Sequence, residues 1–270
     1  MRTACLLWLI AGCGFSSPGP GAAPGGVDAG AGGPGIGGPG ATTGCDVSDG
    51  ALRLCLTFDQ TPMKLADLVN PAHMLADASG VTQILGLVGG AAQFSPTSRI
   101  QFAEHPDFDV AALTVDMWIA PAALAPDKHY GMLDNNTQYD AVYDGDGSVQ
   151  CGIGATTSIN SSAKFMPTIP ATWHHVACTY AGGGDLRVYV DGDLSGCTMG
   201  GGAIPTTGTD GVAIGANFGA GTFKENFTGG IDGVHVYGRA LASDEICRAA
   251  GRSGCSSQCQ SQDGGDHHGP

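Results

Sequence analysis

The chain has 270 residues, of which 13% are charged and 46 are glycine, with 25 Asp and Glu against 11 Lys and Arg. The resulting net charge of -14 repels phosphate backbones, so the composition argues against nucleic acid as a partner. Ten cysteines are too many for a typical reducing compartment, and the absence of a C-x-x-C pair disfavours zinc. The composition therefore favours an exported protein with disulfide bonds.

The first residues have the pattern of an export signal. Arg2 precedes an apolar run over residues 4–11, which is shorter than the about 20 residues that a membrane-spanning helix needs. The run ends in Leu-Ile-Ala-Gly before Cys13, and this order resembles the signal of bacterial lipoproteins. The resemblance implies cleavage after residue 12, acylation of Cys13, and attachment to the bacterial outer membrane or cell surface. An ordinary secretory signal followed by a chance cysteine is the alternative.

Composition divides the rest of the chain into three parts. Residues 13–44 are rich in glycine and proline and have almost no large apolar side chains, so we expect a disordered tether after the lipidated cysteine. Residues 45–254 carry strand patterns throughout and are expected to form one domain. Residues 255–270 are polar and predict a flexible tail.

Several segments of the domain alternate apolar and other residues with a period of two, as strands do when one face lies in a core. These segments are residues 52–58, 113–119, 173–180, 186–190 and 231–237. Helical signals are scarce. We expect a short C-terminal helix over residues 243–250, capped by Ser243, and a second short helix between residues 65 and 77. Many short strands separated by turns predict an all-β sandwich.

Three of these segments, taken together, resemble one known family. Residues 113–119, 173–192 and 227–241 look like the central strand, a strand–turn–strand unit and the closing strand of LamG-like (laminin G-like) jelly rolls. The resemblance covers roughly residues 50–250. It implies a concanavalin A-like jelly-roll sandwich of two antiparallel sheets, in which the first and last strands pair. Members of this family mostly bind sugars, matrix or other proteins, in some cases through calcium.

Two aspartates suggest a metal site. Asp59 follows the first predicted strand and Asp232 lies within the last. If those strands pair antiparallel, the two carboxylates face a common pocket, where backbone carbonyls can complete the oxygen ligands that Ca²⁺ prefers. Calcium is therefore the candidate cofactor. Alternatively, both residues belong to turns or edges and accept hydrogen bonds from backbone N–H groups.

A polar segment carries amide and aromatic side chains, which suit hydrogen bonds to sugar hydroxyls and stacking on sugar rings. Its members are Asp134, Asn135, Asn136, Gln138, Tyr139 and Tyr143. We interpret this segment as a ligand-binding loop at the rim of a sheet. An ordinary solvated loop has the same composition.

Eight cysteines fall within or just after the domain, and predicted strands suggest two pairs. Cys151 and Cys178 lie on strands that can be neighbours, and Cys55 on the first strand can meet Cys247 beside the last. The other four, Cys45, Cys197, Cys255 and Cys259, remain unassigned.

Catalytic patterns are missing from the sequence. Jelly-roll glycosidases need two carboxylates close together, but the three glutamates, Glu104, Glu225 and Glu245, are far apart. No G-x-S-x-G elbow supports a serine nucleophile. His174 and His175 are adjacent on a predicted strand and so point to opposite faces, which prevents one ion from taking both. We therefore expect a protein that is not an enzyme.

The sequence as a whole predicts a surface-anchored, lectin-like or adhesive domain that binds a carbohydrate or an envelope or matrix ligand, with calcium as its cofactor. Its expected partners are a carbohydrate or a surface or matrix protein, together with the membrane that holds the lipid anchor. A structural component of the cell envelope that binds a protein partner is the first alternative. A concanavalin-like glycoside hydrolase is the second.

Overall fold

The computed structural model describes residues 40–259, apart from residues 123, 124, 126, 155, 170, 200, 207, 209 and 220. The expected export signal, the acylated Cys13, most of the tether and most of the tail lie outside the described residues.

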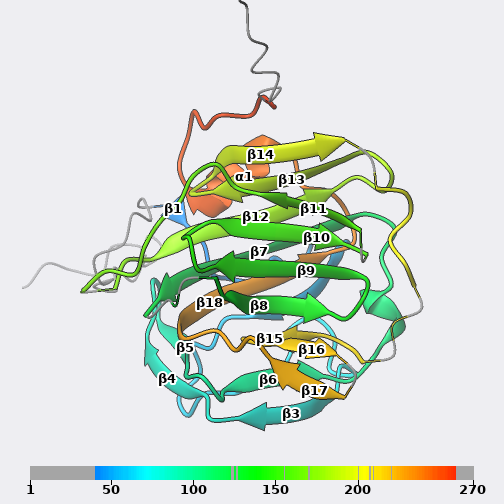
Figure 1. Ribbon diagram of the computed structural model, residues 1–270. Helices are drawn as coiled ribbons and strands as arrows, with labels where there is room; N and C mark the ends of the chain where they lie inside the picture. The colour runs from blue at the N-terminus through cyan, green and yellow to red at the C-terminus, as the bar shows by residue number, and fades with distance from the viewer. Residues whose placement is uncertain are drawn as a thin grey trace, which may run out of the picture. The chain divides into compact units, whose positions relative to one another are not determined.

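Two large antiparallel sheets make up the fold (Figure 1). The first has eight strands in the order β14-β13-β12-β7-β18-β5-β4, and β2 also pairs with β18. Its strands are β2 (Leu52–Leu56), β4 (Thr82–Leu85), β5 (Gly90–Phe94), β7 (Leu113–Pro121), β12 (His174–Tyr180), β13 (Asp185–Val190), β14 (Asp193–Met199) and β18 (Gly229–Tyr237).

The second large sheet has seven strands in the order β11-β10-β9-β8-β15-β6-β3. These are β3 (Leu75–Ser79), β6 (Arg99–Phe102), β8 (His129–Asn135), β9 (Tyr139–Asp144), β10 (Val149–Ile153), β11 (Thr157–Asn160) and β15 (Ala213–Ile214). The remaining elements are β1 (Gly40–Ala41), β16 (Asn217–Gly219), β17 (Thr222–Lys224), β19 (Ala250–Gly251), the 3-10 helix η1 (Pro106–Phe108) and the α-helix α1 (Ser243–Ala249). Strand β1 pairs with β19, and β16 pairs with β17.

The hydrophobic core lies between the two large sheets and follows from the alternation in the sequence. Leu113, Val115, Met117 and Ile119 of β7 point into this core, whereas Trp118 belongs to a separate cluster on the opposite face. Side chains from both sheets fill the core, so each sheet has one face against the other. The predicted all-β sandwich of two antiparallel sheets is confirmed.

The first and last strands of the domain pair, as the resemblance implies. In the antiparallel ladder between β2 and β18, Leu56 lies opposite Val234, and Leu54 lies opposite Val236. Strand β5 pairs with the other end of β18, so β2 and β5 follow each other along the same edge of this long strand. This arrangement brings the chain after β2 close to the loop before β5.

The C-terminal helix is confirmed, but its N-cap differs from the expectation. Helix α1 begins after Ala242, and Glu245 Oε2 accepts the Ala242 N–H at 2.7 Å. The Ser243 hydroxyl instead forms a hydrogen bond with the Tyr189 hydroxyl. Across the described part of the chain, no helix has both the length and the apolar character needed to cross a bilayer.

The second expected helix, between residues 65 and 77, is absent from the structure, which has turns there and then the start of β3. The side chain of Asp67 accepts hydrogen bonds from the backbone N–H groups of Val69 and Asn70. Such local bonds offer the backbone an alternative to helical hydrogen bonding, which explains why the prediction was wrong.

Four disulfides join the eight cysteines of the described chain. Cys151 on β10 is joined to Cys178 on β12, as expected, and this bond links the two large sheets through the core. The remaining bonds are Cys45–Cys55, Cys197–Cys259 and Cys247–Cys255.

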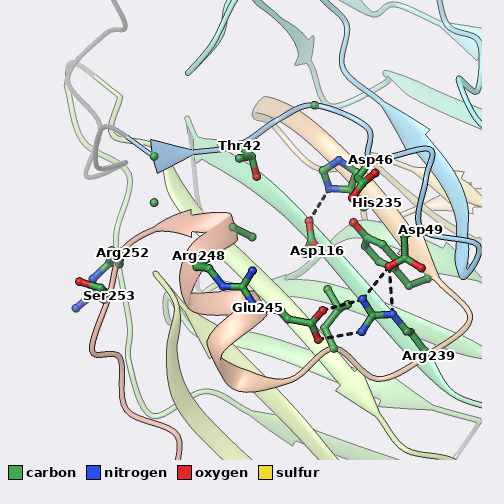
Figure 2. A pocket seen from close by; sticks show the side chains of 16 residues that line it. Thr42, Asp46, Asp49, Asp116, His235, Arg239, Glu245, Arg248, Arg252 and Ser253 are labelled. Atoms are coloured by element: carbon green, nitrogen blue, oxygen red, sulfur yellow. Dashed lines mark hydrogen bonds and ion pairs between the residues drawn. The ribbon is translucent and has the colours of Figure 1, made fainter. Parts of the chain in front are cut away.

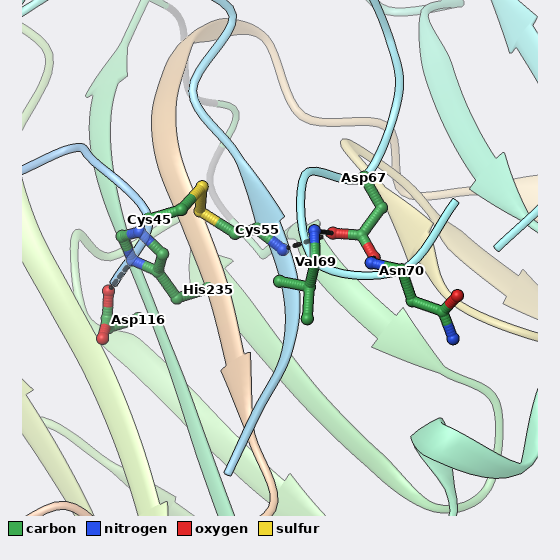
Figure 3. The surroundings of a disulfide bond; sticks show 7 residues. All are labelled: Cys45, Cys55, Asp67, Val69, Asn70, Asp116 and His235. Atoms are coloured by element: carbon green, nitrogen blue, oxygen red, sulfur yellow. Dashed lines mark hydrogen bonds and ion pairs between the residues drawn. A yellow bond between two sulfur atoms is a disulfide. The ribbon is translucent and has the colours of Figure 1, made fainter. Parts of the chain in front are cut away.

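The expected pairing of Cys55 with Cys247 is wrong. Cys55 points away from the core, to the face that the N-terminal segment crosses, and there it meets Cys45 beside His235 (Figure 3). Cys247 is close to Cys255 because the chain turns back after α1. The paths of the N-terminal and C-terminal segments determine which cysteines pair. The alternation of residues along strands does not predict these paths.

Candidate functional site

The structure brings Asp59 and Asp232 together, and we call this pair the acidic site. Both carboxylates bind the loop that connects β4 to β5. Asp59 Oδ1 accepts the Gly90 N–H at 2.9 Å, and Asp232 Oδ2 accepts the Leu87 N–H at 3.1 Å. The pairing of β2 and β5 with the same strand, β18, explains why two residues so distant in sequence meet here.

The two carboxylates of the acidic site differ in exposure. Asp59 is exposed, whereas Asp232 is fully buried and its Oδ1 has no hydrogen-bond partner among the described residues. Burial, and then the charge of Asp59, raise the pKa of Asp232 to about 8. A buried oxygen without a donor, beside a second carboxylate, is an arrangement that a divalent cation stabilises. The acidic site therefore fits Ca²⁺, although each carboxylate also accepts a backbone N–H group.

Two glycines let the loop between β4 and β5 approach these carboxylates. A Cβ atom at Gly86 would lie 2.5 Å from Asp232 Oδ2, and one at Gly89 would lie 2.1 Å from Asp59 Oδ1. Gly89 also has a φ of +66°, which favours glycine. The acidic site thus depends on backbone that passes too close for any other residue.

The segment predicted to bind a ligand is mostly buried. Asn135 and Gln138 are completely buried at the tight turn between β8 and β9. Asn135 Nδ2 donates to Gln138 Oε1 at 3.1 Å, and Gln138 Nε2 donates to Asp109 Oδ1 at 2.7 Å. The Tyr139 hydroxyl donates to the Phe108 carbonyl at 3.3 Å. These groups hold the turn against the chain around η1, so the interpretation as an exposed ligand-binding loop is wrong.

The remaining members of that segment are also bound within the fold. Asn136 forms a hydrogen bond with Asp210, and Tyr143 is buried in the core. Asp134 Oδ2 accepts the Phe218 N–H of β16 at 2.7 Å and lies opposite Asp140 in the β8–β9 ladder. Burial raises the pKa of Asp134 to about 7 and that of Asp140 to about 6.

An open pocket of about 800 Å³ lies elsewhere, between the N-terminal segment 40–49, the C-terminal end of β18 and helix α1 (Figure 2). Asp116 of β7 and His235 of β18 line it, and His235 Nδ1 lies 2.7 Å from Asp116 Oδ1. Both side chains are buried, and His235 Nε2 has no hydrogen-bond partner in the described chain. Part of the pocket lining is therefore a buried polar pair.

The wall of this pocket is charged. Arg239 donates from Nη2 to Asp49 Oδ2 at 2.7 Å and to Glu245 Oε1 at 2.8 Å (Figure 2). The hydrogen bonds from Arg239 lower the pKa of both carboxylates, so these groups stay ionised. Arg248 also lines the pocket from α1 and is exposed, with an ion pair to Asp244 at 3.0 Å. A polar ligand of the size of a short sugar chain matches this size and lining.

The two adjacent histidines point to different surroundings, as expected for a strand. His174 Nδ1 lies 3.0 Å from Asp191 Oδ2, and its ring stacks on Phe165. His175 is buried and forms no side-chain hydrogen bond with the described residues. Its ring packs edge-on against Trp118, and burial lowers its pKa, so the imidazole is neutral.

Sequence reasoning missed the pocket because its residues come from segments that have no shared motif. The predicted tether includes residues 40–44, yet Gly40 and Ala41 pair with β19. The Trp118 Nε1–H also donates to the Thr42 carbonyl at 3.2 Å, which holds this segment against the eight-stranded sheet. In the sequence, the one sign of a segment covering this face is Trp118. It faces away from the core, and its indole N–H needs a hydrogen-bond acceptor there.

Comparisons with known proteins agree on the fold. Residues 94–247 match the sequence model of the concanavalin A-like lectin/glucanases superfamily, Laminin_G_3. A comparison with curated proteins found no match.

Among solved structures, the binding domain of Paraclostridial Mosquitocidal Protein 1 aligns with 76% of this chain and 52% of its own, with a TM-score of 0.60 and 16% identity. Domain 4 of AbnA, a GH43 extracellular arabinanase from Geobacillus stearothermophilus in complex with arabinotriose, aligns over 74% of this chain and 98% of its own, with a TM-score of 0.58 and 18% identity. The binding domain of Botulinum Neurotoxin DC in complex with SialylT aligns with 76% of this chain and 52% of its own, with a TM-score of 0.55 and 13% identity.

The chain spans about half of the length of the two toxin domains that it matches. At these identities the structural likeness establishes the fold alone. The family match covers residues 94–247, which is more than half of the chain. The chain therefore belongs to the concanavalin A-like lectin/glucanases superfamily.

Proposed function

We propose that this protein is a surface-anchored, lectin-like binding domain whose carbohydrate ligand occupies the pocket beside α1. The observation that carries the proposal is the pocket of about 800 Å³ whose lining includes Asp116, His235 and the charged side chains beside α1. Its charged and hydroxyl-bearing side chains suit the hydroxyl groups of a sugar. Support also comes from similar folds that are described in complex with arabinotriose and with SialylT.

Titration calorimetry with the sugars found by a glycan array tests this proposal. Arg248→Ala should weaken glycan binding by about tenfold, because an arginine on the pocket wall contributes charge-assisted hydrogen bonds. Arg187→Ala is the matched control, since Arg187 forms a similar ion pair with Asp185 on β13 and does not line the pocket. Equal affinities for the two variants would contradict the pocket assignment. Binding to no glycan would favour the alternative of an envelope component that binds a protein.

The proposal is for binding without catalysis. The three glutamates have separate structural contacts: Glu104 accepts the Gly211 N–H, Glu225 binds Asn217, and Glu245 binds Arg239. Asp134 and Asp140 both have a raised pKa and lie opposite each other. A substrate has little access to this pair, because Asp134 is buried beside β16. We expect no release of reducing sugar from any bound glycan. A rate of release that Asp140→Asn abolishes would overturn this expectation.

Anchoring and calcium belong to the same proposal. The four disulfides support folding in an oxidising compartment, and the lipoprotein-like signal before Cys13 would hold the domain at the outer membrane or cell surface. Cys13→Ser should then move the protein from the membrane fraction to the soluble fraction. The acidic site would hold one Ca²⁺ that stabilises the junction of β2, β18 and the loop before β5, outside the glycan pocket.

A further inference from the structure

A cluster of two histidines and one aspartate lies at one end of the seven-stranded sheet, apart from both sites described above. We call His73, His105 and Asp107 the histidine site. One potential ligand atom of each residue lies within 4.8 Å of those of the other two. We propose that the histidine site binds a first-row transition metal ion, with Zn²⁺ as the reference ion.

Strand pairing brings these residues together. His73 lies just before β3, and His105 lies just after β6, in an antiparallel pair whose register places Leu75 opposite Phe102. The ladder continues one step further, where the Ala103 N–H donates to the Met74 carbonyl at 2.8 Å. Asp107 follows in η1. The site is therefore held by two strands and a helical turn, all of which are fixed by backbone hydrogen bonds.

Two of the three distances between ligand atoms are close to those around a tetrahedral ion. Asp107 Oδ2 lies 3.2 Å from His73 Nε2 and 3.6 Å from His105 Nδ1. Zinc–nitrogen and zinc–oxygen bonds of about 2.0 Å at tetrahedral angles place two ligand atoms roughly 3.3 Å apart. The two imidazole nitrogens lie within 4.8 Å of each other, so one ion can contact all three atoms after the side chains move towards it.

His73 has the supporting contacts that are typical of a metal-bound histidine. Its Nδ1 donates to Asp67 Oδ2 at 2.7 Å, and both side chains are completely buried. Asp67 is itself fixed, because its Oδ1 accepts the Cys55 N–H of β2 at 2.8 Å and the Val69 N–H at 3.1 Å (Figure 3). A carboxylate on Nδ1 fixes the tautomer and leaves the Nε2 lone pair for a metal ion, as in carboxylate–histidine–zinc arrangements.

Neighbouring contacts of the other two ligands are compatible with an ion. Asn70 Nδ2 donates to Asp107 Oδ2 at 2.8 Å and lies 3.4 Å from His73 Nε2, so the amide orients the carboxylate. His105 Nδ1 accepts the Asp107 N–H at 3.2 Å, so this nitrogen is unprotonated, and an ion would replace that N–H as the partner of its lone pair.

The site is open to solvent on one side. The His105 and Asp107 side chains are 28% and 41% exposed, whereas that of His73 is 0% exposed. An ion can therefore enter from solvent and bind water in its fourth position. Because two of the three ligands are imidazoles, the histidine site favours zinc, nickel or cobalt over calcium or magnesium. The ion would fasten the loop that carries Asp67 and His73 to η1.

The test uses the full chain with His267→Ala and His268→Ala, because adjacent tail histidines can also bind transition metals. After treatment with EDTA and its removal, titration with Zn²⁺ should show one ion per chain. His105→Ala and Asp107→Asn should each weaken binding by at least about tenfold. His129→Ala is the matched control, because His129 Nδ1 lies 2.6 Å from Asp144 Oδ1 and the described residues form no three-ligand cluster there.

Two further measurements separate a metal site from a purely structural histidine. Co²⁺ should produce visible absorption bands typical of low coordination number in the parent chain but not in His105→Ala. Zn²⁺ should raise the melting temperature of the parent and not of Asp107→Asn, whose folded state is verified by circular dichroism. No stoichiometric Zn²⁺ binding, or binding unchanged by both ligand substitutions, would overturn the proposal and leave His73 as a bridge between Asp67 and Asp107.

Discussion

The acidic site and the histidine site collect charged groups in opposite ways. In the acidic site two carboxylates meet, one buried oxygen has no donor, and the pKa of Asp232 rises to about 8. In the histidine site, His73 lies between the carboxylates of Asp67 and Asp107. The pKa of Asp107 is lowered there, and the hydrogen bond from Asn70 is the largest cause. The first arrangement is costly until a cation binds, whereas the second is satisfied without one. A metal ion should therefore affect stability more at the acidic site.

The largest expected effect comes from breaking the support of the histidine site. Asp67→Ala leaves the buried Nδ1 of His73 and several backbone N–H groups, including that of Cys55, without an acceptor. We expect a loss of about 3–5 kcal/mol in the free energy of unfolding, measured by urea denaturation without metal. Asp77→Ala, which breaks the half-exposed ion pair with Arg99, should cost less than about 1 kcal/mol. A similar small loss for Asp67→Ala would show that the network is not satisfied in the way described.

Calcium should have the next largest effect, and only through the acidic site. At a concentration 100 times its dissociation constant, Ca²⁺ should stabilise the EDTA-treated protein by about 2.7 kcal/mol, which raises the melting temperature by about 5–10 °C. Asp232→Asn should abolish this shift, and Asp244→Asn, on the exposed face of α1, should preserve it. A shift that persists in Asp232→Asn would place the calcium elsewhere.

Asp134 is a third acidic group, and it lies outside both candidate cation sites. It therefore shows how burial alone changes the pKa of a carboxyl group and the stability of the fold. Burial raises the pKa of Asp134 to about 7, so its contribution to stability is complete below the unfolded value near 4 and is lost as the pH rises through 7. Between pH 5 and pH 8 this loss amounts to about 2–3 kcal/mol. Asp134→Asn, whose amide oxygen can still accept the Phe218 N–H, should make the decline in melting temperature shallower over this range. Asp127 is exposed, so Asp127→Asn is the control and should leave the decline in melting temperature unchanged. If the melting temperatures of both variants decline in parallel, Asp134 does not cause the pH dependence.

Local patterns in the sequence predicted those parts of the molecule that local physics determines. Alternation over residues 113–119 and 231–237 gave the correct faces of β7 and β18. The meeting of Asp59 and Asp232 followed from one further step, the pairing of the first and last strands.

The remaining features depend on chain paths that alternation does not encode. Asn135 and Gln138 have the composition of a sugar-binding loop, but the loop around η1 covers them and uses their amides. His73 and His105 are far apart in sequence and become neighbours only through the β3–β6 register. The pairing of Cys55 with Cys45 depends on a segment that crosses the face of a sheet.

The entry of the N-terminal segment into the fold has a mechanical consequence. Gly40 and Ala41 are held to β19 by a two-residue ladder, and the disulfide from Cys45 to Cys55 lies only a few residues further on. A pulling force on the chain before Gly40 would separate β1 from β19. The detachment would then stop at Cys45, because the disulfide holds that residue to β2. The peeled residues include Thr42 and Gly44, which form one wall of the pocket. Tension would thus displace one wall of the pocket while the sandwich beneath stays folded.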